Sequence, residues 1–186
     1  MCRFITAVLP NDVDIEKCAE VFHAHRRACA AYSNPALAAA IGNEASCYCT
    51  TVGHCDCDSP LGSANFRGSA GRGKTPEAAA ARMRSKGWSE AKIARALGQR
   101  SEADARPRSP VRGGREETTL DEWCALIRDV LAFRGVAFVG LLIHQYGGSV
   151  DDEAIVLQKH EVVRARDLDE TILAAMHSDT IYEFRR

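Results

Sequence analysis

Residues 135–146 read GVAFVGLLIHQY. Apolar side chains fall on both faces of this run, which is typical of a strand covered on both sides. The run is too short to span a membrane. Gly135 also suits the end of a preceding helix, because glycine is favoured just after a helix C-terminus. We therefore expect a central strand here and build the rest of the fold outward from it.

The last third of the chain continues on either side of this strand. Thr119 and Glu122 form a capping box that predicts a helix with an apolar stripe. Its expected buried residues are Leu120, Trp123, Cys124, Ile127, Val130 and Leu131. After the strand, residues 153–165 (EAIVLQKHEVVRA) predict a second, antiparallel strand. A short helix capped by Asp167 and a closing edge strand at 180–184 (TIYEF) follow.

The first third predicts a second group of elements. Residues 2–10 (CRFITAVLP) alternate as in a strand, and a helix with Cys18 and Cys29 on its buried face follows. A short apolar helix, PALAAAIG, starts at residue 35. The order β-α-β, then α-β-β-α-β, predicts an α+β fold with one mixed or mainly antiparallel sheet.

Charge divides the chain into three parts. Residues 1–66 carry a net charge of −3, residues 67–115 carry +9, and residues 116–186 carry −7. The acidic parts are expected to share one sheet, with a Cys-rich hairpin in the first. The basic middle predicts a helical insertion with two helices around Gly87, then a linker over 99–117. Its charge favours docking on the acidic flanks or binding of an anionic partner, nucleic acid included.

Length and cysteine content limit the class of protein. The 186 residues suit one domain, or one domain with an insertion. The N-terminus lacks the pattern of a signal peptide, so the cytoplasm and no membrane partner are expected. Thiols stay reduced in that compartment. The eight cysteines are therefore interpreted as core residues, metal ligands or reactive groups before disulfides.

Half of these cysteines lie in one stretch, SCYCTTVGHCDCDSPLGS (46–63). Cys47, Cys49, Cys55 and Cys57 follow the pattern C-x-C-x5-C-x-C, with His54 beside the third. Zinc prefers four soft or borderline ligands in a tetrahedron. Four of these thiols, or three with His54, would supply them, so this set is the candidate zinc site.

The geometry of a hairpin decides whether four thiols can meet. A three-residue loop at 52–54 puts all four on one face, whereas a two-residue loop puts the two pairs on opposite faces. Two alternatives stay open: core thiols beside an ordinary turn, or a redox or nucleophilic Cys55 or Cys57. His54 would lower such a thiol's pKa, and the flanking aspartates would raise it.

Residues 53–63, GHCDCDSPLGS, resemble a segment of small uncharacterised bacterial proteins. The likeness extends to the layout of a CRFITAVLP-like start and a DEW…LL-H…YEF end. Where this chain has Asp58 and Ser59, the resemblance leads us to expect Gly and Thr. It implies no activity, so no catalytic residue is carried over.

Two further motifs lie in the basic middle. GSAGRGKT (68–75) matches the phosphate-binding G-x4-G-K-[ST] pattern, but no buried strand precedes it and Pro76 lacks the amide that would face a phosphate. GWSEAKIARALGQRS (87–101) resembles the first half of a helix-turn-helix with its turn at Gly98. Its base-reading helix would be short and acidic. A basic loop and a docked helix pair are the favoured interpretations.

The other histidines form no catalytic set with a serine or a carboxylate, although His144 and His160 are expected on neighbouring strands. The sequence therefore favours a non-catalytic, cytoplasmic bacterial protein that binds a protein partner, for example a toxin-neutralising immunity protein. The first alternative is a zinc-binding or thiol-dependent protein centred on residues 47–57, with zinc as the candidate cofactor. The second is a nucleic-acid binder that uses residues 67–115.

Overall fold

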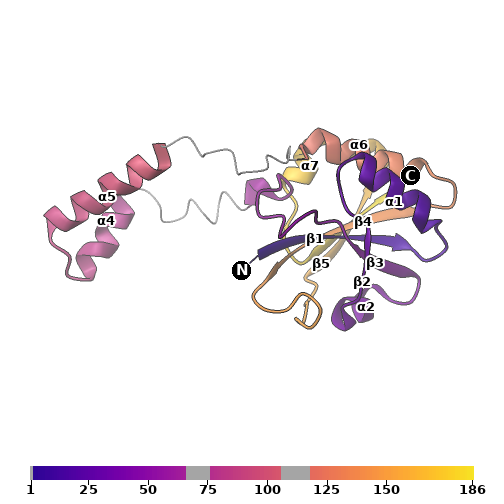
Figure 1. Ribbon diagram of the computed structural model, residues 1–186, viewed down its shortest axis with the longest axis horizontal. Coiled ribbons are helices and arrows are strands. Elements are labelled where there is room, and N and C mark those ends of the chain that lie inside the picture. Colours follow the sequence, from indigo (N-terminus) through magenta and orange to yellow (C-terminus); the bar gives the residue numbers. More distant parts are fainter. Residues whose placement is uncertain (1, 66–75, 106–117) are drawn as a thin grey trace. The chain divides into compact units, whose positions relative to one another are not determined.

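A computed structural model describes residues 2–65, 76–105 and 118–186 (Figure 1). The chain divides into two compact units, one made of Met1–Asn65 with Glu117–Arg186 and the other of Phe66–Glu116. The first unit holds a six-stranded mixed sheet with helices packed on it. The α+β class predicted from the sequence is confirmed.

The sheet has the strand order β2-β3-β1-β4-β6-β5. Its strands are β1 (Cys2–Pro10), β2 (Ala30–Tyr32), β3 (Ala45–Cys49), β4 (Phe138–Tyr146), β5 (Lys159–Arg164) and β6 (Thr180–Arg185). All neighbours pair antiparallel except β5 and β6, which are parallel. The long strands β1 and β4 lie side by side in the middle of the sheet.

Helices cover both faces of this sheet. Figure 1 shows α1 and α6 on one side and α2 on the other. The helical segments of this unit include α1 (Ile15–Ala24), α2 (Pro35–Ile41), α6 (Leu120–Ala132), the 3-10 turn η1 (Ala165–Asp167) and α7 (Glu170–Ala174). The capping box of Thr119 and Glu122 at the start of α6 is present, as predicted.

Burial on both faces of β4 explains its apolar sequence. Leu141 and Ile143 are buried, and so are Leu142 and Tyr146, which alternate with them along the strand. Leu142 and Tyr146 belong to a core cluster with Leu37 of α2. The expectation of a central strand covered on both sides is therefore confirmed.

Two details of the topology differ from the sequence-based expectation. The return strand β5 pairs with β6 and not with β4, so β6 is interior and β5 is the edge. The reason is that η1 and α7 lie between β5 and β6, and a helical crossover of this kind joins parallel strands. In addition, α1 ends at Ala24, so Cys29 lies beyond the helix, just before the unpredicted strand β2.

The second unit contains a helix pair, described here by itself. It consists of α4 (Pro76–Ser85) and α5 (Glu90–Ala105). Gly98 lies inside α5, so the helix-turn-helix with a turn at this glycine is wrong. Residues 99–105 of the expected linker are helical, and the rest of it lies outside the described residues. The simpler expectation of two helices is confirmed. The phosphate-binding motif at 68–75 lies outside the described residues.

Among the residues described, none of the helices combines the length and the apolarity needed to cross a membrane.

Candidate metal centre

The cysteine loop after β3 lies along the first half of β1. Strand β3 pairs with β1 only from Thr6 to Pro10. Beyond that point the loop supplies the hydrogen-bond partners: Thr50 N donates to Ile5 O (3.0 Å), and Asp56 N donates to Arg3 O (2.7 Å). In return, Arg3 N donates to the sulfur of Cys57 (3.4 Å). The loop thus satisfies backbone groups of β1 that would otherwise be unpaired.

Arg3 anchors the far side of this loop. Its guanidinium donates to the carbonyl oxygens of Asp56 (2.9 Å), Cys57 (3.0 Å), Ser59 (2.5 Å) and Leu61 (3.4 Å). The residue is only 6% exposed, so these bonds replace the water that the cation loses on burial. One side chain of β1 therefore shapes the loop from residue 56 to residue 61.

Asp56 anchors the loop from within. Its side chain is 3% exposed, and the Arg27 guanidinium contacts its Oδ1 at 2.5 Å. Its Oδ2 accepts from the backbone N of Ile5 (3.0 Å) and from the Thr51 hydroxyl. Arg27 in turn stacks over the ring of Trp123, 4.7 Å from the ring centre. This buried ion pair connects the loop to α6 and to the core.

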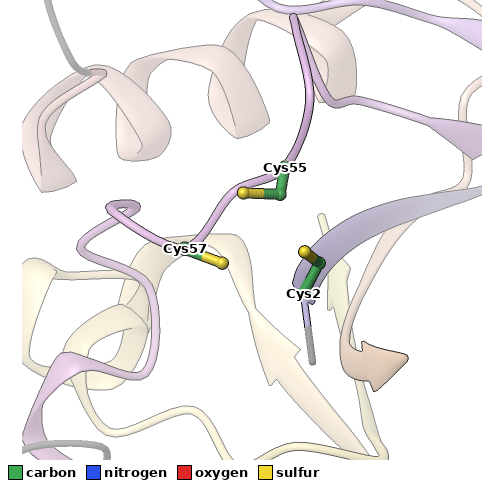
Figure 2. A group of neighbouring side chains, drawn as sticks. All are labelled: Cys2, Cys55 and Cys57. Atoms are coloured by element: carbon green, nitrogen blue, oxygen red, sulfur yellow. The ribbon is translucent and has the colours of Figure 1, made fainter. Parts of the chain in front are cut away.

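Three thiols converge where the anchored loop meets the start of β1. The sulfurs of Cys2, Cys55 and Cys57 all lie within 4.8 Å of one another. Figure 2 shows the three sulfurs pointing toward one another, Cys2 from β1 and the other two from the loop. Cys2 and Cys57 are exposed and Cys55 is half-buried, so the cluster is open to solvent.

Hydrogen bonds, charge and burial shift the pKa values of Cys57 and Cys55 in opposite directions. The backbone N–H of Arg3 contributes most to lowering the pKa of Cys57, helped by the Cys55 thiol and the Arg3 charge. The Cys57 backbone N–H acts to lower the pKa of Cys55, but the hydrogen bond to the Cys57 sulfur and burial outweigh it and raise that pKa. The Arg3 backbone N–H and the Arg3 charge therefore favour the thiolate form of Cys57.

The sequence-derived set is only partly brought together. Cys55 and Cys57 belong to the cluster, whereas Cys47, Cys49 and His54 do not. Cys47 is in the core cluster, and burial raises its pKa to about 12. Cys49 is half-buried at the end of β3, and His54 is exposed in the loop.

The expected Cys-rich hairpin does not form, so the choice between a two-residue and a three-residue hairpin loop does not arise. Strand β3 pairs with β1 on one edge and with β2 on the other. No edge of β3 is left for residues 54–58 to pair with, so they run beside β1 as a loop. Because β3 and the loop separate at Thr50, the thiols of β3 and those of the loop occupy different places.

Cys2 is the ligand candidate that sequence reasoning missed. From the sequence alone it is an ordinary residue of a first strand, and its neighbours in sequence carry no metal-binding pattern. Its proximity to the loop depends on bonds between residues more than fifty positions apart, such as Arg3 to Asp56. The buried position of Arg3 also marks this part of β1, but that burial can be seen only in the folded structure.

The histidines on β4 and β5 do not meet, because β6 lies between these strands. His144 Nδ1 lies 2.5 Å from Asp179 Oδ1, and His160 Nε2 lies 2.9 Å from Glu183 Oε2. His160 and Glu183 line a hollow of about 350 Å³ beside α2. The Glu183 carboxylate already has His160 and Arg185 as partners, so the thiol cluster is the stronger candidate site.

Comparison with protein-family models, with curated proteins and with solved structures gave no match. The candidate site therefore rests on its own chemistry.

Proposed function

We propose that this protein binds a thiophilic metal ion, with zinc as the first ion to test, through the thiolates of Cys2, Cys55 and Cys57. The observation that carries this proposal is the convergence of three sulfurs within 4.8 Å of one another. A tetrahedral zinc centre has sulfurs about 3.8 Å apart, so small rotations of the three side chains would suffice.

The surroundings of the cluster support the same proposal. Binding a metal requires deprotonated thiols. The Arg3 backbone N–H, which lies 3.4 Å from the Cys57 sulfur, favours the thiolate there, and the Arg3 charge adds to this effect. Soft thiolate ligands select ions such as zinc and monovalent copper over calcium or magnesium.

Three protein ligands leave a fourth coordination position open. Structural zinc sites are closed by four protein ligands, whereas three ligands and an open position are typical of sites that bind a further molecule. Because Cys2 and Cys57 are exposed, a water molecule or an external ligand could take that position. The proposed centre is thus an accessible site and not a structural zinc knot.

The proposal predicts which cysteines matter for zinc binding. Reduced protein without a histidine tag is expected to bind about one equivalent of zinc. Cys2→Ser, Cys55→Ser and Cys57→Ser should each weaken binding by about 100-fold or more, since each removes one of only three protein ligands. Competition with a chromogenic chelator measures the affinity, and elemental analysis measures the stoichiometry.

Cys49→Ser is the matched control, because Cys49 belongs to the sequence-derived set and lies outside the cluster. It should bind zinc like the unmodified chain. Loss of zinc in Cys49→Ser together with retention in Cys2→Ser would refute the three-thiol site. A zinc content below about a tenth of an equivalent in the unmodified, reduced chain would refute zinc binding altogether.

A further inference from the structure

Cys57 combines three properties of an oxidant-sensitive thiol. Its side chain is exposed, its sulfur accepts a hydrogen bond from Arg3 N at 3.4 Å, and two other sulfurs lie within 4.8 Å. Cysteines that react with peroxide are accessible and are often placed beside a second thiol that completes the reaction. Among the described cysteines, Cys47, Cys18 and Cys124 are buried and do not meet the first condition.

We infer that Cys57 is a site of reversible oxidation by hydrogen peroxide and that Cys55 resolves the oxidised form as a disulfide. Cys55 is chosen over Cys2 because it lies two residues from Cys57 in the same loop and its sulfur lies within 4.8 Å of the Cys57 sulfur. Cys2 lies in β1, where its strand pairs with β4.

The chemistry needs only peroxide as co-reactant. The Cys57 sulfur attacks one peroxide oxygen, so that an S–O bond forms, the O–O bond breaks, and the leaving hydroxide takes the thiol proton to become water. The Cys55 sulfur then attacks the Cys57 sulfur, so that the S–S bond forms and the S–O bond breaks, and the leaving hydroxide takes the Cys55 thiol proton to become a second water. Two thiols lose two electrons, and one peroxide gains them.

Oxidation would also control the metal site, and this part of the inference rests on the function proposed above. A disulfide between Cys55 and Cys57 removes two of the three thiolate ligands. Peroxide should therefore release zinc, and bound zinc should protect both cysteines from oxidation.

The test uses the full, reduced, metal-free chain treated with hydrogen peroxide and then with an alkylating reagent. A protease that cleaves before aspartate separates Cys55 from Cys57 at Asp56, so mass spectrometry can identify the linked peptides. We expect a Cys55–Cys57 disulfide that forms about tenfold faster than oxidation of the half-buried Cys49. In Cys55→Ser, dimedone should instead trap a sulfenic acid on Cys57.

The outcomes distinguish a failure of this inference from a failure of the proposed metal binding. Equal oxidation rates at Cys57 and Cys49 would overturn the inference even if zinc binds. A disulfide from Cys57 to Cys2 would overturn the assignment of Cys55. Formation of the Cys55–Cys57 disulfide in a chain that binds no zinc would support the oxidation site while the metal proposal fails. Cys49→Ser serves as the control and should oxidise like the unmodified chain.

Discussion

Asp56 lies between the two cysteines of the loop, and its carboxylate is held by three different parts of the chain. It contacts Arg27, accepts from the backbone of Ile5, and accepts from the Thr51 hydroxyl. The positions of the Cys55 and Cys57 thiols depend on this carboxylate, because these two residues directly precede and follow Asp56 in the chain. A single acidic residue therefore organises a cluster in which it is not a ligand.

Replacing Asp56 should destabilise the fold strongly. Asp56→Ala leaves Arg27 buried without its partner, and removal of one member of a buried ion pair costs about 3–5 kcal/mol of unfolding free energy. Urea denaturation measures the change. Asp58→Ala is the control, since Asp58 is exposed on the same loop, and its effect should stay within about 0.5 kcal/mol. Equal effects of the two substitutions would contradict the role given to Asp56.

The thiols also show which part of the candidate site could be predicted from the sequence and which part could not. The pattern C-x-C-x5-C-x-C drew attention to Cys55 and Cys57, and both belong to the cluster. It also included Cys47 and Cys49, because local spacing cannot tell that β3 has partners on both edges. Cys2 was left out because its neighbours in space come from a loop that begins after residue 49. Local patterns carry no information on such distant contacts.

At the scale of elements, the parts predicted best are those whose signals are local. The capping box of α6 and the two-sided apolar pattern of β4 are both present as expected. Strand β2 was missed because its three residues, Ala30–Tyr32, are too few to establish an alternating pattern. The partner of β5 was predicted wrongly, because strand pairing is decided by the crossover through α7 and not by the residues of β5.

The capping box at the start of α6 predicts that the unfolding free energy depends on pH. The Thr119 backbone N–H holds the pKa of Glu122 below its ordinary value of 4.5. A carboxyl with a lowered pKa in the folded state stabilises the fold above its unfolded pKa, and the contribution is lost as pH falls through the folded pKa. Glu122→Gln should therefore lower the unfolding free energy at pH 7.

This difference between the original chain and Glu122→Gln should narrow as the pH falls from 4.5 downward. Denaturant titrations at a series of pH values measure it. Thr119→Ala removes the other half of the capping box and should cost about 1 kcal/mol with a weaker dependence on pH. A Glu122→Gln difference that stays constant down to strongly acidic pH would contradict the assigned hydrogen bond.

At the scale of the whole molecule, the chain interrupts one α+β unit with a second compact unit, Phe66–Glu116. Each unit has buried apolar residues of its own, including Ala80 and Ile93 in the helix pair. The binding of a protein partner, with an immunity protein as one form, stays a prediction from size and charge. The binding of nucleic acid through residues 67–115 stays a prediction from their net charge of +9.

Removal of the basic segment tests both the division into units and the nucleic-acid prediction. Replacing residues 67–115 by a Gly/Ser linker should leave the first unit with a single cooperative unfolding transition and with its zinc affinity unchanged within about threefold. If the full chain binds nucleic acid in a salt-dependent manner, this deletion should abolish the binding. Loss of cooperative unfolding would contradict the independence of the first unit.

The bonds that Arg3 makes to four loop carbonyls have a consequence for how an ion would be captured. Small zinc domains of the finger type gain their fold from the metal and unfold when a chelator removes it. Here the loop is tied to β1 by Arg3 and to α6 through Asp56 and Arg27, independently of any ion. The conformational entropy of the segments that carry the thiols is thus lost when the chain folds, and not when an ion binds. An ion can therefore bind to the site and leave it while the fold remains unchanged.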